Sequence, residues 1–501
     1  MLASSTLPKD PGRAPLRRGQ DRRGLTLRLA AAWLLLVPLG AVAADETPLP
    51  TAWADRFRQA PFEASFSDDR WLGERASYAI PAAEVVLFDV LLNVYNRHAV
   101  GGDYESTAAT IRRNLRGGWT VDQDPFKTNQ LGHPYQGATH YGFARSAGLS
   151  FWESTGYALA GSALWEIAGE ATPPSVNDLI NTGIGGSFMG EALFRLASLL
   201  LENEDIPPLW REVAAAAVSP PLGVNRLAFG ERFDRVFASR KPALYSRVHL
   251  GFMATAENTS GTSTTSLRRN EAQAEYAIDY GLPGKPGYGY RRPFDLFAFQ
   301  ATASSANGFE NLMTRGLLVG RAYDAGPDVA GAWGLYGSFD YIAPQVYRVS
   351  STGLSVGTTG QWWVTPSVAM QGTALLGAGY TAVGTTRSSS EIDYNYGIAP
   401  QALVAWRTIL GDGVALDLTG RAYFVSRVAA VDHRGRDVIG RLDAALTWRV
   451  YKRHGVTVKV VGNVRDARYD DLGDLSQSRN TIGLFYTYLG QDGLGAVPRP
   501  Q

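Results

Sequence analysis

The spacing of apolar residues divides the chain into two halves. Between about Ile80 and Glu202 apolar residues recur at helical intervals, and after Lys241 they alternate with polar ones, as in β-strands. Three stretches of the first half predict helices: 80–98, 150–171 and 175–201. Their longest charge-free runs hold about a dozen residues, fewer than the ~18 that span a bilayer, so we expect these helices to be buried against protein.

The alternation is clearest in "GRDVIGRLDAALTWRVY", residues 435–451. One face of this predicted strand carries Val438, Gly440, Leu442, Ala444, Leu446, Trp448 and Val450, and the other carries Asp437, Arg441, Asp443, Thr447 and Arg449. Runs of this kind begin near Leu244, Glu271, Pro293, Glu310, Val329, Thr352, Ser367, Tyr394, Val414, Gly435, Val456 and Asn480. Clusters of Gly, Asp, Asn, Pro and Ser between the runs suit turns.

Twelve long strands favour an outer-membrane β-barrel over the alternative, a secreted soluble β domain. Each strand with its loop takes about 20 residues, and a strand that crosses a membrane needs about 9–11. The charged faces suit a wet lumen, and the apolar faces suit lipid. One feature is unusual, because membrane barrels generally end on an aromatic residue, whereas here the tail "GQDGLGAVPRPQ" follows the last strand. We predict an α+β chain: a small N-terminal helical domain followed by an antiparallel, about 12-stranded outer-membrane-type β-barrel.

The N-terminus predicts export to the cell envelope. A basic start, the uncharged stretch "LAAAWLLLVPLGAVAA" and the small residues Ala41–Ala43 form a secretory signal peptide, cut near Ala43. Its removal leaves 41 basic and 45 acidic residues, a net charge of −4, which argues against a nucleic-acid partner. The chain has no cysteine and so no disulfide or thiolate metal site.

The predicted organisation has six parts. They are the signal peptide (1–43), an N-terminal segment with one apolar helix (44–117), a helical domain (118–205), a connector with one short helix (206–240), the barrel (241–490) and a C-terminal tail (491–501).

The helical domain carries recurring motifs: G-H-P-Y-Q-G, F-W-E-S, W-E-x-x-G-E, P-P-S-x-N-D-L-I and G-G-x-x-x-G-E. With them, residues 118–205 resemble a bacterial family known as domain of unknown function 3943. The resemblance implies membership but no activity, because the family has none established. The residues that match its motifs are His133, Pro134, Tyr135, Gln136, Arg145, Glu153, Trp165, Glu166, Glu170, Asn177, Asp178 and Glu191.

His133 and His140 are the strongest candidates for chemistry. If Pro134 opens a helix, two turns separate them and both imidazoles lie on one face. They would then supply two metal ligands, completed by Glu153 or Glu166, or a general base. No third ligand has a diagnostic spacing, however, and a polar packing seam explains the pattern better. Arg145 with Glu153 or Glu166 would bind a phosphate or carboxylate, or form a buried ion pair.

The remaining polar residues fit structural roles. Ser175 and Asp178 have capping-box spacing, and Glu191 and Arg195 are an i, i+4 pair. Asp89, Asn93 and Asn96 share one helix face, which meets either water or the next helix. His249, the only histidine in a clear strand, has no serine partner.

Two functional hypotheses follow. In the first, the protein is an outer-membrane β-barrel whose helical domain caps or plugs the periplasmic mouth, with a role in transport or envelope organisation. It would contact outer-membrane lipid and the barrel-assembly machinery, with no cofactor and with an undetermined small-molecule or lipid ligand. In the second, it is an envelope hydrolase of lipid or glycan that uses His133, His140, Arg145 and Glu166 in one open pocket.

Overall fold

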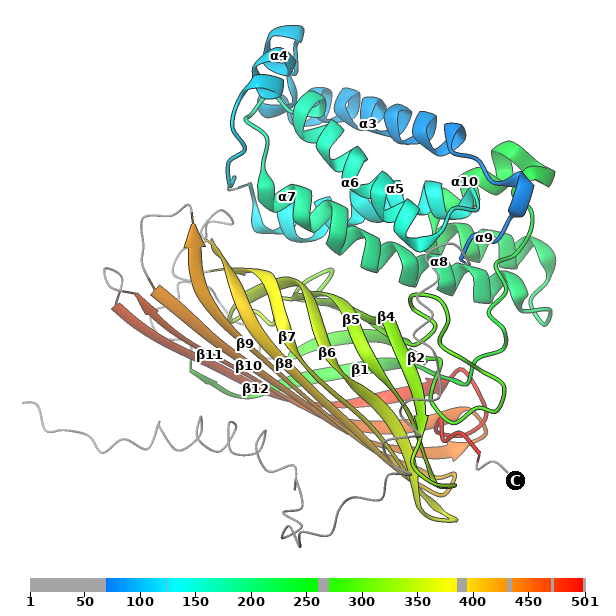
Figure 1. Cartoon of the computed structure of the whole chain (residues 1–501). Coiled ribbons are helices and arrows are strands. Elements are labelled where there is room, and N and C mark those ends of the chain that lie inside the picture. Colours follow the sequence, from blue (N-terminus) through cyan, green and yellow to red (C-terminus); the bar gives the residue numbers. More distant parts are fainter. Residues whose placement is uncertain are drawn as a thin grey trace, which may run out of the picture. The chain divides into compact units, whose positions relative to one another are not determined.

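The second half of the chain folds into a closed antiparallel β-barrel. The structure, a computed structural model, describes residues 69–122, 124–259, 270–384, 394–429, 435–469 and 473–498, so the predicted signal peptide lies outside the described residues. Each strand pairs with its neighbours in the sequence, and β1 closes the barrel on β12 (Figure 1). The strands are β1 Leu244–Thr259, β2 Asn270–Tyr280, β3 Phe297–Ser304, β4 Asn311–Asp324, β5 Val329–Ile342, β6 Arg348–Thr365, β7 Val368–Gly384, β8 Tyr394–Leu410, β9 Val414–Ala429, β10 Gly435–Tyr451, β11 His454–Tyr469 and β12 Gly473–Leu489.

The predicted fold class and strand number are confirmed. The observed strands begin within four residues of the predicted starts, except β12, which begins at Gly473 instead of near Asn480. Its first residues, "GDLSQSR", show little apolar alternation, because polar side chains occupy both faces there. The alternation of apolar and polar residues therefore does not reveal where this strand begins.

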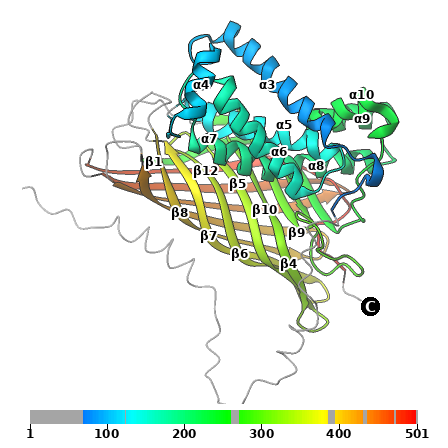
Figure 2. The same cartoon turned by 45° about the horizontal axis from the view of Figure 1, so that its top comes forward.

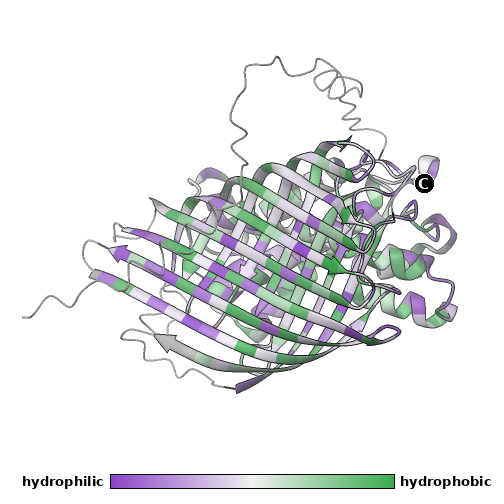
Figure 3. Ribbon diagram, turned by 90° about the horizontal axis from the view of Figure 1, so that it is seen from below, coloured by the Kyte–Doolittle hydropathy of each residue, from purple (hydrophilic) through white to green (hydrophobic). Residues whose placement is uncertain are grey.

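Hydrophobic and hydrophilic residues alternate along the strands (Figure 3), and in β10 the two kinds lie on opposite faces, as predicted. Arg441 and Asp443 point into the barrel, where Arg441 Nε donates to Asp443 Oδ2 at 2.8 Å. Leu442, between them, points outward and is 56% exposed. Further ion pairs line the lumen: Lys459–Glu275, Arg421–Asp340, Arg465–Asp437 and Arg479–Glu271.

The two ends of the barrel have connections of different length. At the end where β1 begins and β12 ends, here called the terminal end, four connections take two to four residues: 325–328, 366–367, 411–413 and 452–453. At the other end, here called the loop end, the described connections 305–310 and 343–347 take six and five residues. The fifth connection at the terminal end, 281–296 between β2 and β3, is long and does not follow this pattern. Short turns are typical of the periplasmic side of outer-membrane barrels, so the four short turns favour that side for the terminal end if the barrel is inserted in the outer membrane.

The first half forms a helical bundle, comprising α3 to α10. Its helices are α3 Ala79–Ala99, α4 Ala108–Arg116, α5 His133–Ser146, α6 Phe151–Leu164, α7 Val176–Ile180, α8 Gly186–Glu202, α9 Pro208–Val218 and α10 Pro220–Phe229. Five-residue π-helical segments, η3 Thr128–Gly132, η4 Trp165–Gly169 and η5 Asn181–Gly185, adjoin α5, α6 and α8. The connector holds two helices, α9 and α10, where we expected one, and α4 was not predicted.

The expectation that all these helices are buried is wrong for α3. Among the described residues, Gly73–Ala99 and Val176–Glu202 are long and apolar enough to cross a membrane. The second stretch is mostly buried, but only 22% of the apolar window of the first is buried. The length of charge-free runs did not reveal the apolar side of α3, because Glu84 and Asp89 interrupt these runs. Both residues lie away from the exposed side of the helix.

The bundle packs on the outer wall of the barrel. Phe188 and Met189 of α8, with Phe126, Tyr141 and Phe151, form one apolar core with outward-facing strand residues. These strand residues, here called the covered patch, are Ile278, Tyr280, Phe297, Phe299, Leu312, Phe339, Tyr341, Ala382, Tyr394 and Tyr396. Figure 2 shows the helices over β4 to β8. The expected position at the periplasmic mouth is therefore corrected: large aromatic side chains on these strands give the bundle an apolar seat on the wall.

The C-terminal tail, by contrast, enters the lumen. Leu494 and Val497 pack against the inward-facing Tyr245, Ala369 and Ile409 at the terminal end. The Val497 carbonyl accepts hydrogen bonds from Gln361 Nε2 at 2.8 Å and Trp363 Nε1 at 3.1 Å, and the Gly495 carbonyl accepts one from Gln371 Nε2 at 2.8 Å. The segment that looked unusual after the last strand is thus a plug held by lumen side chains.

Candidate functional site

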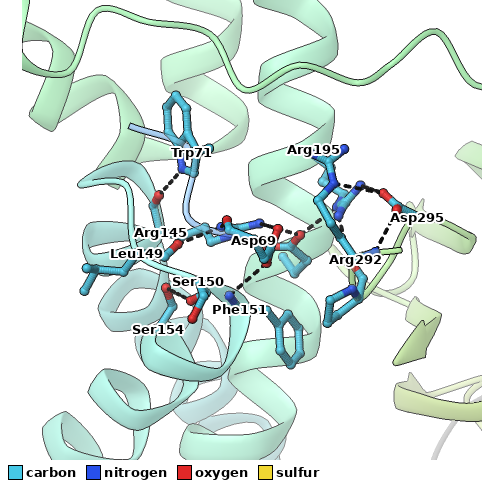
Figure 4. A network of polar contacts seen from close by, with 12 residues as sticks. Asp69, Trp71, Arg145, Leu149, Ser150, Phe151, Ser154, Arg195, Arg292 and Asp295 are labelled. Atoms are coloured by element: carbon cyan, nitrogen blue, oxygen red, sulfur yellow. Dashed lines mark hydrogen bonds and ion pairs between the residues drawn. The ribbon is translucent and has the colours of Figure 1, made fainter. Parts of the chain in front are cut away.

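A buried charge network joins the bundle to the barrel (Figure 4). Glu191 of α8 lies between two arginines, Arg145 Nε at 2.9 Å and Arg195 Nε at 2.6 Å. Arg145 also donates to Asp69 Oδ1 at 2.9 Å, and Arg195 to Asp295 Oδ1 at 3.0 Å, in the connection between β2 and β3. These side chains are at most 4% exposed. Each charge faces an opposite one, so the network is a structural anchor.

Arg145 therefore pairs with other acids than the two we expected. The predicted buried ion pair exists, but its partners are Glu191 and Asp69 in place of Glu153 or Glu166. Glu153 instead caps α6 by accepting from the Ser150 backbone N–H, and it pairs with Arg70. The Arg70 hydrogen bond lowers the pKa of the Glu153 carboxyl to about 2.

A second network of acids and amides lies at the other end of the bundle. Glu166 accepts from the Ser175 backbone N–H at 2.7 Å, and the Ser175 hydroxyl accepts from the Asp178 N–H, which makes Ser175 the N-cap of α7. Burial, with Glu170 nearby, raises the pKa of the Glu166 carboxyl above its usual range. The Glu166 carboxyl serves here as the acceptor for the backbone N–H of the cap residue.

Amides carry this second network to the barrel wall. Asn177 Nδ2 donates to Asp122 at 2.7 Å and to the Tyr396 hydroxyl at 2.9 Å. Gln130 Nε2 donates to the same hydroxyl at 2.7 Å. Asn181 receives a hydrogen bond at 3.4 Å from Thr352 of β6. The polar motifs of this domain thus contact the outer wall of the barrel.

The two histidines have separate surroundings. His140 Nε2 lies 2.8 Å from Asp89 Oδ1, and Gln136 donates to the same oxygen at 3.3 Å, so the polar stripe of α3 faces its neighbouring helix. His133, at the start of α5, is 4% exposed. Trp165 Nε1 donates to Glu170 at 2.7 Å. In the part of the chain that the structure describes, no group of three or more His, Asp or Glu side chains is arranged to hold a metal.

The remaining motif residues stabilise the fold. Pro134 stands in the first turn of α5, and Tyr135 beside it is half exposed. His133, His140, Arg145 and Glu166 are each at most 4% exposed, and none of them lines the lumen cavity beside Arg247 or the smaller one beside Arg479. The hydrolase hypothesis requires these side chains to surround one open pocket, and in this structure their side chains are buried in separate polar contacts.

The barrel lumen holds a cavity of about 120 Å³. Four arginines and three aspartates line it: Arg247, Arg315, Arg407, Arg421, Asp279, Asp340 and Asp417. Arg407 pairs with Asp417 at 2.6 Å, and Arg421 pairs with Asp340 at 3.0 Å. Among the described residues, Arg247 and Arg315 have no carboxylate within 4 Å, although Arg247 lies over the Tyr245 ring, 5.6 Å from its centroid. The cavity therefore carries an excess of positive charge and two unpaired guanidinium groups.

Sequence reasoning did not single out these arginines. Both occupy inward positions of strands, Arg247 opposite Ala277 and Arg315 opposite Ala298, where alternation alone could have marked them as lumen residues. Which lumen arginine has an acid beside it depends on the register of neighbouring strands, and a single sequence does not determine that register.

The fold and these surfaces define an outer-membrane-type β-barrel with a helical domain attached to its wall. Residues 118–221 match the family described as "Domain of unknown function (DUF3943)", which confirms the resemblance seen in the motifs and extends it through α9 to the start of α10. No curated protein matches the chain.

Solved structures similar to this chain include outer-membrane channels. The KdgM porin is 8% identical, with a TM-score of 0.23 over 49% of this chain and 98% of that one. The outer membrane channel DcaP of Acinetobacter baumannii is 11% identical, with a TM-score of 0.24 over 49% and 96%. A mutant of the TodX monoaromatic hydrocarbon channel is 7% identical, with a TM-score of 0.21 over 55% and 94%.

Proposed function

We propose that the protein is an outer-membrane channel for small organic anions, closed at its periplasmic end by its own C-terminal tail. The observation that carries the proposal is the lumen cavity with its two unpaired arginines. A guanidinium group binds carboxylate and phosphate in a bidentate manner, and a confined positive charge concentrates anions. The solutes are therefore small molecules that bear carboxylate or phosphate groups.

In this proposal the C-terminal tail closes the lumen at the terminal end of the barrel. It occupies the terminal end of the lumen through Leu494, Val497 and the amides of Gln361 and Gln371, so solutes pass only when it leaves this seat. The exposed outward residues of β9 to β12 and β1 would face outer-membrane lipid, and the barrel-assembly machinery would insert the barrel.

Ion conductance in planar lipid bilayers tests the proposal. We expect low conductance for the full chain and a several-fold higher conductance for a chain that ends at Asp492, which lacks the residues seated in the lumen. In a tenfold KCl gradient, the reversal potential of the shortened channel should show a preference for chloride. Arg315→Gln in the shortened chain should reduce that preference.

Arg436→Gln is the matched control, because Arg436 is an exposed residue on the outer face of β10. It removes the same charge from outside the lumen and should leave the reversal potential unchanged. A shortened chain that does not conduct, or one that prefers potassium, contradicts the proposal.

A further inference from the structure

Helix α3 has its polar and apolar sides reversed relative to a helix that faces water. We propose that the helical bundle lies in the lipid bilayer beside the barrel, with the exposed side of α3 against acyl chains. The inference rests on the proposed function in one respect, namely that the barrel itself is inserted in the outer membrane.

The exposed side of α3 is apolar along its length. From Ala82 to Tyr95 the exposed residues are Ala82, Ala83, Val86, Leu87, Val90, Leu91, Val94 and Tyr95. Their four-residue spacing makes one continuous stripe. Val90, Leu91 and Tyr95 are 53%, 58% and 67% exposed. A surface helix of a protein in water carries charged residues on this side, and an apolar patch of this extent indicates an apolar partner.

The polar residues of α3 point the other way, into the bundle. Asp89 is 5% exposed and contacts His140 and Gln136 of α5. Asn93 donates to the carbonyl oxygens of Tyr104 at 2.9 Å and Gly169 at 2.6 Å. Polar groups that satisfy one another inside a bundle, behind an apolar exterior, are the arrangement expected of helices in a bilayer.

The length of the apolar stretch fits a bilayer. At a rise of about 1.5 Å per residue, residues 79–96 extend about 27 Å, close to the roughly 30 Å of a hydrocarbon core. Charged residues bracket this stretch on both sides: Arg70, Glu74 and Arg75 before it, and Arg97, Arg112, Arg113 and Arg116 after it. Within residues 79–96 the charged side chains are Glu84 and Asp89, and both lie away from the exposed stripe.

The position of the bundle connects this stripe to the lipid-facing wall of the barrel. Phe188, near the start of α8, packs on Gly337 in the part of β5 nearer the loop end, whereas Arg195, further along α8, binds Asp295 at the terminal end. Helix α8 therefore runs along the height of the wall. Helix α3 contacts α5 and α6, and these two helices pack on α8 (Figure 1). Lipid that surrounds the barrel at this height reaches α3 as well.

Site-directed spin labelling tests the inference, and the chain favours the method because it has no cysteine of its own. A nitroxide is attached at Leu91→Cys on α3, at Leu484→Cys on the outer face of β12, which is 60% exposed, and at Arg112→Cys on exposed α4. The labelled full chains are reconstituted in phosphatidylcholine liposomes. Collision rates are then measured with oxygen, which concentrates in lipid, and with a water-soluble nickel chelate.

We expect the label at residue 91 to behave like the label at residue 484, with oxygen collisions several-fold more frequent than nickel collisions. The label at residue 112 should show the reverse. If oxygen collisions dominate for the label at residue 484 but nickel collisions dominate for the label at residue 91, the inference is overturned and the proposed function stands. If residue 91 is shielded from both reagents, another protein or a second copy covers α3, which also overturns the inference. If residue 484 reads water, both proposals fail.

Discussion

At the scale of single residues, Glu191 holds two buried arginines in place. Glu191→Gln keeps the volume of the side chain but removes the charge that Arg145 and Arg195 share. Removing one partner of a buried ion pair costs about 3–5 kcal/mol, because a charge is left uncompensated. We therefore expect the bundle of the refolded Glu191→Gln chain to become sensitive to protease at a lower urea concentration than the bundle of the parent chain.

The control for this prediction is the same substitution at Glu212, whose side chain is half exposed and pairs with Arg226 across α9 and α10. Exposed pairs contribute about 1 kcal/mol or less, so Glu212→Gln should change the urea concentration little. Equal effects of the two substitutions would show that the network of Glu191 does not anchor the bundle.

At the scale of elements, glycines let α5 and the segment η5–α8 touch. A Cβ atom on Gly137 would lie 1.8 Å from the backbone oxygen of Thr182, and a Cβ atom on Gly186 would lie 2.7 Å from the Gly137 Cα. Because the obstacle is backbone, it cannot move without separating the helices. We expect Gly137→Ala to abolish protease resistance of the bundle while the barrel still forms, as seen by heat-modifiable migration on gels.

Gly156→Ala is the matched control, since Gly156 lies on the exposed side of α6 and a Cβ atom there would have nothing within 4 Å. Alanine favours a helix over glycine by about 1 kcal/mol, so this variant should be as resistant as the parent or more so. Loss of resistance in both variants would mean that glycine is needed for a reason other than close packing.

The elements also show what a sequence can and cannot predict. Strand positions were predictable because an inner face rich in charge and an outer face rich in aliphatic side chains leave a period of two. The site on the wall where the bundle packs was not predictable, because Phe299 and Phe339 follow the same alternation as Leu442. Alternation marks an outward side chain but does not distinguish a helix from lipid as its neighbour. For the same reason the sequence predicted a buried ion pair for Arg145 without identifying Glu191 as its partner.

At the scale of the whole molecule, the outer wall of the barrel has two kinds of surface. Phe297, Phe299 and Phe339 of the covered patch are at most 6% exposed under the helices. Leu442, Leu484 and Phe252, elsewhere on the wall, are 56%, 60% and 72% exposed. The first surface is a protein core, in which burying each aromatic side chain contributes roughly 1.5–3 kcal/mol. The second is left largely uncovered by the described residues, and the proposed membrane placement requires that it faces lipid.

The last prediction tests that requirement at Leu442, which lies midway along β10 opposite Gly420 and Gly462. If the wall faces lipid, Leu442→Arg places a charge near the middle of the bilayer, which costs about 2–4 kcal/mol, and should block assembly. Arg441→Leu, one position away, removes a lumen charge, and Asp443 keeps Lys459 at 3.8 Å, so the barrel should form in nearly normal yield. The yield of heat-modifiable barrel in liposomes measures both variants. Equal yields, or greater damage from Arg441→Leu, would reverse the assignment of faces and with it the membrane placement of the barrel.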